Sequence, residues 1–241
     1  MFGGMRGVGI VLFDYDDTLV DVGEAREFAR RVVAGRISSL TGVGESVVLD
    51  VVRGVESRME SLGLFDRRVW FWRVVAELGV ELGVDLINEL VRVYWDSWSS
   101  RSRLFPETLP VLRQLRACGY RLGMVTNTDG EPGLKRDRLR RDGVYDFFDL
   151  IIVAGDDTEH VKPHPEPFLK ALRVLGVEGR EAVYVGDRVS TDVPGAKAVG
   201  MYAVIVDRSG SLGIDDLGGG SRPDFIISSL LDLPQILGCN G

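Results

Sequence analysis

Short apolar runs separated by amphipathic helical stretches constrain this sequence more than any other feature. Five such runs lie at 9–13, 120–127, 150–156, 182–187 and 202–207. An unbroken apolar run of this length is typical of a strand that is buried on both faces of a parallel sheet. Where strands of a parallel sheet alternate with helices, each helix connects one strand to the next by a right-handed crossover. The sequence therefore predicts an α/β fold with a Rossmann-like parallel sheet.

Four of these runs end in polar residues, and the first run ends in three acidic residues that repel one another. Asp14, Asp16 and Asp17 follow "IVLF" within four positions. Two like charges about 4 Å apart repel by about 4 kcal/mol at an effective dielectric constant near 20. Ligands of parallel sheets bind at the carboxyl ends of the strands. The three aspartates therefore either form a solvated turn or belong to a site in which a positive charge offsets their repulsion.

The stretch from 21 to 104 has a different pattern. Its apolar residues repeat at helical spacing in four successive segments, which predicts a four-helix bundle inserted after the first strand. We expect a core formed by 1–20 and 105–241 and a helical cap formed by 21–104. The tryptophans Trp70, Trp72, Trp95 and Trp98 all lie in this insert. Trp95 falls off the apolar stripe of its helix, which favours a place at the mouth of a pocket.

Composition limits the class of protein. The formal net charge is −7, and general nucleic-acid binding favours a basic surface instead. Cys118 and Cys239 show no metal-type spacing, so we expect no disulfide and a cytoplasmic location. No apolar run reaches the length of a membrane span, so no membrane association is expected. We expect the basic segment 135–141 to form a solvated helix face and the glycine-rich segment 208–222 to form a loop.

Four motifs occur in an order that resembles the haloacid dehalogenase superfamily. They are "DYDDT" at 14–18, "VTN" ending at Asn127, Lys162 followed by proline, and "GDRVSTD" from 186 to 192. The helical insert is similar to that family's C1-type cap. Lys162 also stands out because the chain has only four lysines among 29 basic residues. His164 stands where the family often has aspartate, at the start of a helix.

The resemblance implies a role for each motif residue. Asp14 would be the nucleophile, and Asp16 would be the general acid and base. Mg²⁺ would be held by Asp14, the main-chain carbonyl of Asp16 and Asp187. Thr126, Asn127 and Lys162 would bind substrate, with Lys162 also catalytic, and Asp192 would orient Lys162 or a water. Independently of the family, converging carboxylates need a cation, and hard oxygen ligands suit Mg²⁺.

These residues predict a phosphatase that is similar to the family's phosphatase branch. Its substrate would be a small phosphorylated metabolite, hydrolysed with Mg²⁺ through an aspartyl-phosphate. Dehalogenase members of the superfamily lack the second aspartate, which this chain keeps as Asp16. A phosphomutase of the same fold is the nearest alternative, although its fourth motif usually reads as an adjacent acidic pair. A non-catalytic metal-dependent binding protein remains a third possibility.

Overall fold

A computed structural model describes residues 5, 7–212 and 222–239. The chain forms two compact units, each described by itself below. The first comprises Met1–Val20, Leu104–Thr128 and Lys135–Gly241. The second comprises Asp21–Arg103 and Asp129–Leu134.

The first unit is built on a six-stranded sheet in which all neighbouring strands are parallel. The strand order is β5-β4-β1-β6-β7-β8. The strands are β1 (Ile10–Phe13), β4 (Arg121–Asn127), β5 (Leu150–Ala154), β6 (Ala182–Gly186), β7 (Tyr202–Val206) and β8 (Phe225–Ile227). The predicted α/β fold and its five apolar strands are thus confirmed. The edge strand β8 was missed because three residues are too few for a periodic signal.

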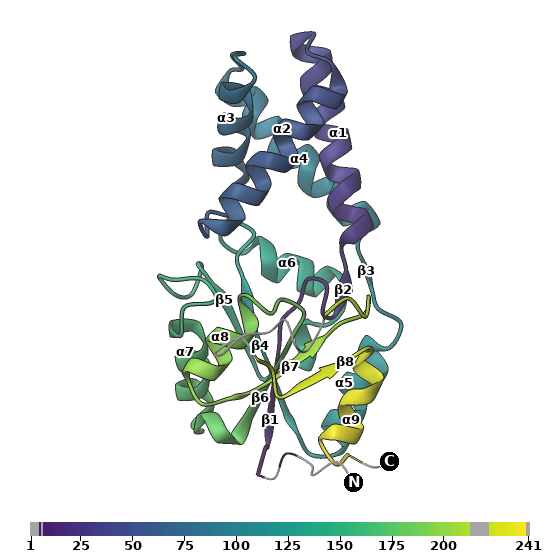
Figure 1. The fold of residues 1–241 in the computed structure, drawn as a ribbon, viewed down its shortest axis with the longest axis vertical. Coiled ribbons are helices and arrows are strands. Elements are labelled where there is room, and N and C mark those ends of the chain that lie inside the picture. The colour runs from purple at the N-terminus through teal and green to yellow at the C-terminus, as the bar shows by residue number, and fades with distance from the viewer. Residues whose placement is uncertain (1–4, 6, 213–221, 240–241) are drawn as a thin grey trace. The chain divides into compact units, whose positions relative to one another are not determined.

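Helices cover both faces of this sheet (Figure 1). On one face, α7 and α8 contribute Phe168, Leu172 and Val193 to a core that includes Leu12 and Tyr184 of the strands. On the other face lie α5 and α9, which contact each other. The helices of this unit are α5 (Thr108–Ala117), α6 (Leu134–Arg141), α7 (Glu166–Leu175), α8 (Asp192–Ala198) and α9 (Leu233–Ile236). Because β1 lies in the middle of the sheet, its carboxyl end adjoins those of β4 and β6.

The second unit contains four helices in succession. They are α1 (Gly23–Thr41), α2 (Glu45–Ser61), α3 (Arg67–Glu77) and α4 (Val84–Arg101). A separate two-stranded sheet pairs β2 (Val20–Asp21) with β3 (Arg103–Leu104). The apolar stripe predicted for α4 is buried throughout, at Ile87, Leu90, Val91, Tyr94 and Trp98.

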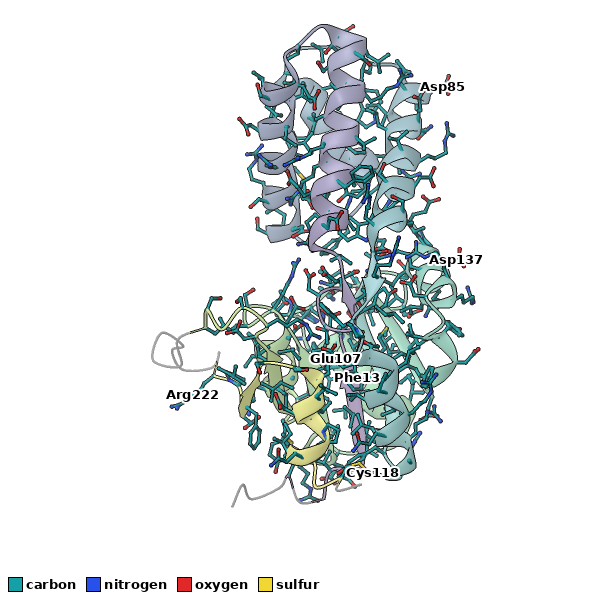
Figure 2. All side chains as sticks on the ribbon, turned by 90° about the vertical axis from the view of Figure 1, so that its right-hand side faces the viewer. Phe13, Asp85, Glu107, Cys118, Asp137 and Arg222 are labelled. Atoms are coloured by element: carbon teal, nitrogen blue, oxygen red, sulfur yellow. A yellow bond between two sulfur atoms is a disulfide. The ribbon has the colours of Figure 1, made fainter. Side chains whose placement is uncertain are left out.

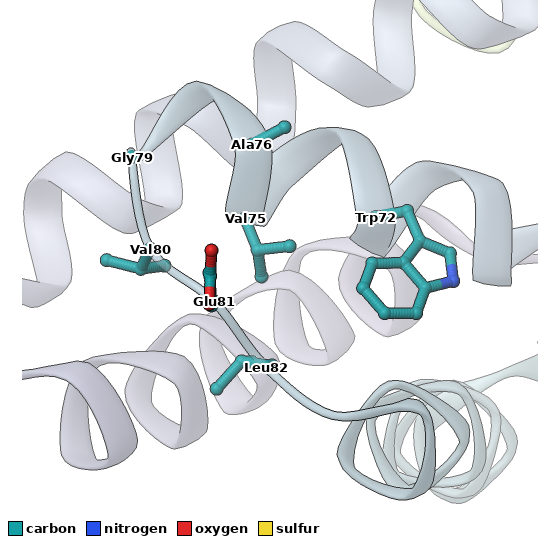
Figure 3. Close-up of a pocket in the computed structure, with 7 residues that line it drawn as sticks. All are labelled: Trp72, Val75, Ala76, Gly79, Val80, Glu81 and Leu82. Atoms are coloured by element: carbon teal, nitrogen blue, oxygen red, sulfur yellow. The ribbon is translucent and has the colours of Figure 1, made fainter.

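The structure corrects two expectations about the aromatic residues of this unit. Trp95 is only 7% exposed and its ring lies 5.3 Å from that of Tyr94, so it belongs to the core and not to a pocket mouth. Conversely, Trp72 is 44% exposed and lines a surface pocket with Val75 and Leu82 (Figure 3). The helical spacing of apolar residues at 69–78 predicts a buried face that includes Trp72, but the buried face of α3 is formed mainly by Trp70, Phe71 and Val74.

A disulfide joins Cys118 to Cys239, so the expectation of unpaired cysteines is wrong. Cys118, labelled in Figure 2, directly follows α5, and Cys239 follows α9. The two Cα atoms are 5.8 Å apart. Tyr120 also donates a 2.5 Å hydrogen bond to the carbonyl of Leu237 in this region. No sequence pattern predicts this bond, because the cysteines are separated by 121 residues and have no motif spacing.

Two further expectations can be compared only with the residues that the structure describes. Most of the predicted loop at 208–222 lies outside the described residues, which omit 213–221. Among the described helices, none has both the length and the apolar character required to cross a bilayer.

Candidate active site

The first acidic residue of the chain lies at the carboxyl end of the central strand. The Asp14 amide donates a 2.9 Å hydrogen bond to the carbonyl of Val185, which continues the pairing of β1 with β6. Asp14 is buried, with 7% of the residue exposed. The chain then turns sharply, and Asp17 takes a positive φ of 59°. This left-handed conformation is one that aspartate tolerates better than most residues. The turn leaves the Asp14 carboxylate in the pocket of charges described next.

Lys162 brings three elements together through its ammonium group. Its Nζ lies 3.0 Å from Asp14 Oδ2 and 2.8 Å from Asp192 Oδ1. It also donates a 2.8 Å hydrogen bond to the Tyr184 hydroxyl, which in turn donates to the carbonyl of Val125 at 2.6 Å. Burial alone would lower the pKa of Lys162, but Asp14 and Asp192 outweigh it and raise the pKa above its usual value. Lys162 is therefore a fixed, buried cation.

The segment that carries Lys162 is anchored to the end of β4. The Lys162 amide donates a 2.9 Å hydrogen bond to the Asn127 side-chain carbonyl. The Asn127 side-chain oxygen thus holds the protein's own backbone in this structure, and the substrate contact expected for Asn127 stays a prediction. Thr126, the residue before it, is 2% exposed. Both residues lie at the strand end predicted for them.

Asp192 depends on a glycine at the end of β6. A Cβ atom added to Gly186 would lie 2.2 Å from Asp192 Oδ2, so only glycine leaves room for this carboxylate. The same oxygen accepts a 2.9 Å hydrogen bond from the Arg188 amide. Asp192 is the first residue of α8, and Thr191 precedes that helix at its N-cap position. The Asp192 carboxylate therefore binds Lys162 and a loop amide, and its part in orienting the lysine stays a prediction.

Asp187 completes a cluster of three carboxylates. Asp14, Asp187 and Asp192 each offer an oxygen within 4.8 Å of the others. The Thr18 hydroxyl donates a 3.1 Å hydrogen bond to Asp187 Oδ1. Burial, followed by repulsion from Asp14 and Asp192, raises the pKa of Asp187 to about 8. A site that makes a carboxylate hold its proton this strongly is short of positive charge, and three carboxylate oxygens fit a hard divalent cation.

Asp16 lies apart from this cluster and has cations of its own. Its carboxylate forms ion pairs with Lys135 and Arg138 of α6, whose side chains are both 3% exposed. Burial would raise the pKa of Asp16, but Arg138 and Lys135 hold it well below its usual range. The expectation of a solvated basic helix at 135–141 is therefore wrong for these two residues. Their burial is tolerated because a carboxylate pairs with both, whereas an unpaired buried charge would be costly.

Comparison with known proteins places the chain in a family. A family model described as haloacid dehalogenase-like hydrolase matches residues 8–200. The chain belongs to the haloacid dehalogenase-like hydrolases. It is 31% identical over 230 residues to a glyceraldehyde 3-phosphate phosphatase of Methanopyrus kandleri, covering 94% of this chain and 96% of that protein. It is 30% identical over 228 residues to a phosphoglycolate phosphatase of Nitrosococcus oceani, covering 95% and 96% of the two chains.

A solved structure supports the same relationship. The crystal structure of a haloacid dehalogenase-like phosphatase from Thermococcus onnurineus matches with a TM-score of 0.72 and 32% identity. The match covers 97% of this chain and 99% of that one. As a haloacid dehalogenase-like hydrolase, the protein carries its carboxylate cluster where the fold places ligands.

Sequence reasoning missed three residues that shape this site in the haloacid dehalogenase-like core. Tyr184 reads as one more apolar residue of β6, although its hydroxyl accepts from Lys162. Lys135 and Arg138 lie three positions apart on α6, a spacing that puts both on one face and toward a common partner. The scarcity of lysine, which singled out Lys162, applies equally to Lys135 and could have singled it out.

Proposed function

We propose that this protein is a Mg²⁺-dependent phosphatase that hydrolyses a small phosphomonoester through an aspartyl-phosphate on Asp14. The observation that carries the proposal is the buried Lys162 ammonium, 3.0 Å from Asp14, in a cluster of three carboxylates whose negative charge this one cation does not balance. Relatives named as glyceraldehyde 3-phosphate and phosphoglycolate phosphatases support a substrate of two or three carbons. The compartment is proposed to be the cytoplasm, a proposal that the cysteines no longer support because Cys118 and Cys239 form a disulfide.

In the first half of the reaction, an oxygen of Asp14 attacks the phosphorus atom and the bond to the ester oxygen breaks. Asp16 donates its proton to the leaving alcohol. Lys162 stabilises the negative charge that Asp14 and the phosphoryl oxygens share. When bound by Asp14, Asp187 and the Asp16 carbonyl, Mg²⁺ supplies further positive charge beside these oxygens. Thr126 and Asn127, at the end of β4, are proposed to bind the phosphate.

In the second half, Asp16 accepts a proton from water, and the water oxygen attacks the phosphorus of the aspartyl-phosphate. The bond to Asp14 breaks and inorganic phosphate leaves. The ion pairs with Lys135 and Arg138 keep Asp16 ionised in this structure, which suits its role as the base. Its role as the acid requires Asp16 to turn away from these cations and take up a proton. Residues 21–104 are proposed to be the cap that selects the substrate.

The test is a phosphate-release assay with Mg²⁺ on glyceraldehyde 3-phosphate, phosphoglycolate and a small aryl phosphate. Asp14→Asn should abolish release from all three because an amide is not a nucleophile. Asp16→Asn should also cripple release. The matched control is Asp137→Asn on α6, whose side chain is 73% exposed and which should remain active.

Three outcomes would contradict the proposal. Near-normal turnover by Asp14→Asn would exclude the covalent intermediate. Full activity after exhaustive chelation would exclude the metal. Transfer of a mass-labelled phosphoryl group to a second position of a sugar phosphate, without release of phosphate, would identify a mutase.

A further inference from the structure

The two histidines of the chain flank the active-site lysine. The segment reads His160-Val161-Lys162-Pro163-His164, and Glu166 follows at the start of α7. The two imidazole rings stack with their centroids 3.9 Å apart and an interplanar angle of 16°. Glu166 Oε2 lies 2.8 Å from His160 Nδ1. The three side chains thus form one group on the surface of the first unit.

We propose that His160, His164 and Glu166 form a second metal site, which binds a borderline transition-metal ion such as Zn²⁺. One ligand atom from each of these residues lies within 4.8 Å of the other two. Two imidazoles and one carboxylate are a ligand set that Zn²⁺ and its neighbours in the first transition series favour. The cluster of Asp14, Asp187 and Asp192 offers oxygen atoms alone and suits a hard ion instead. Ligand chemistry therefore separates the two sites.

The local hydrogen bonds prepare the group for a metal. The amides of Glu159 and His160 donate to the Glu166 carboxylate at 3.3 and 2.9 Å, and this orients it toward the histidines. The Glu166 amide donates to His164 Nδ1 at 3.2 Å. A ring nitrogen that accepts a hydrogen bond presents a lone pair, which is the form that coordinates a metal. A bound ion would replace this contact.

The rearrangement required is small. Ligand atoms bound to a tetrahedral Zn²⁺ at about 2.1 Å lie about 3.4 Å from one another. Ligand atoms that now lie up to 4.8 Å apart must therefore approach by no more than about 1.4 Å, whereas His160 Nδ1 and Glu166 Oε2, now 2.8 Å apart, would separate slightly if both bind the ion. The stacked rings must also splay, because a metal lies in the plane of each imidazole that binds it. His160 is 50% exposed and Glu166 is 37% exposed, so their side chains can turn.

A metal at this position would link the two ends of the segment that carries Lys162. His160 and His164 each lie two residues from the lysine, one before it and one after it. The Lys162 amide is itself held by Asn127. Occupancy would therefore fix the backbone that presents the ammonium to Asp14. This proposal does not depend on the phosphatase reaction.

The first experiment observes the wild-type protein directly. Untagged, uniformly ¹⁵N-labelled protein is saturated with Mg²⁺ and titrated with Zn²⁺ while the ring nitrogens of histidine are recorded by NMR. The chain has only two histidines, so two sets of ring signals are expected and no variant is required for assignment to this segment. Both sets should shift and saturate together at one equivalent. Ring signals that remain unchanged would overturn the proposal.

The second experiment measures Zn²⁺ affinity by calorimetry in the same Mg²⁺-saturated buffer. His160→Ala, His164→Ala and Glu166→Gln should each weaken binding more than about tenfold, since each removes a ligand. Glu178→Gln changes an exposed glutamate of the same unit and is the matched control, with unchanged affinity expected. Asp187→Asn should also bind Zn²⁺ normally. Loss of binding in Asp187→Asn, or retention of binding in all three ligand variants, would assign the ion elsewhere and refute the site.

Discussion

The protonation of Asp187 predicts that the metal-free protein loses stability as the pH rises. Burial and the neighbouring carboxylates raise its pKa from 3.8 to about 8 in the folded protein. Between these two values the folded state keeps a proton that the unfolded state has lost. Stability therefore falls with increasing pH across this window, and the loss is complete once the folded group ionises above pH 8.

The slope follows from proton linkage. A full proton of difference corresponds to about 1.4 kcal/mol for each pH unit. Between pH 6 and pH 8 the folded group itself begins to ionise, so the expected loss is about 2 kcal/mol. Mg²⁺ should remove this dependence, because a divalent cation beside Asp187 favours the ionised carboxylate and binds only the folded site.

The assay is urea unfolding at pH 6 and pH 8, with chelator and with Mg²⁺. It is followed by far-UV circular dichroism because all four tryptophans lie in the helical unit and do not report on the core. Asp187→Asn is the matched variant, since its amide cannot titrate. The wild-type protein should lose about 2 kcal/mol in chelator, and the variant should lose far less. An equal loss in the variant, or a loss that Mg²⁺ leaves unchanged, would refute the reasoning.

Three further predictions concern single side chains. Lys162→Arg should lower turnover by about 10²–10³-fold, because the planar guanidinium cannot replace an ammonium that contacts Asp14, Asp192 and Tyr184. Lys170→Arg is the control in the same phosphate-release assay, and equally small effects of the two substitutions would show that Lys162 is not part of the site. Cys239→Ser removes a disulfide that spans 121 residues and should lower the free energy of unfolding, measured with urea, by up to about 5 kcal/mol. If the urea midpoint of the wild-type protein is the same under reducing and oxidising conditions, the bond does not form. Trp95→Ala should destabilise the helical unit by about 3–5 kcal/mol, whereas Trp72→Ala at an exposed position should cost less than about 1 kcal/mol, both measured by thermal unfolding. A larger loss of stability in Trp72→Ala than in Trp95→Ala would mean that Trp95 is not in the core.

The sequence by itself determined the sheet and the place of the site. The first strand reads as an unbroken apolar run because a central parallel strand is buried on both faces, and all four residues of β1 are buried. The acids that follow had to lie at the carboxyl edge because strand direction is common to the whole sheet. Asp14, Asp187 and Asp192 meet there. Patterns with a short period and residues at strand ends are local, so a single sequence displays them.

Only the tertiary structure decided which charges meet. The sequence places Lys135 and Arg138 in a basic segment, and a run of charges is ordinarily solvated because burial of an unpaired charge is costly. Their partner, Asp16, lies 119 and 122 residues away, and no local pattern reports a pairing over that distance. The disulfide between Cys118 and Cys239 was hidden for the same reason. The stability of a buried charge or of a paired cysteine depends on its neighbour in space, and the fold alone supplies that neighbour.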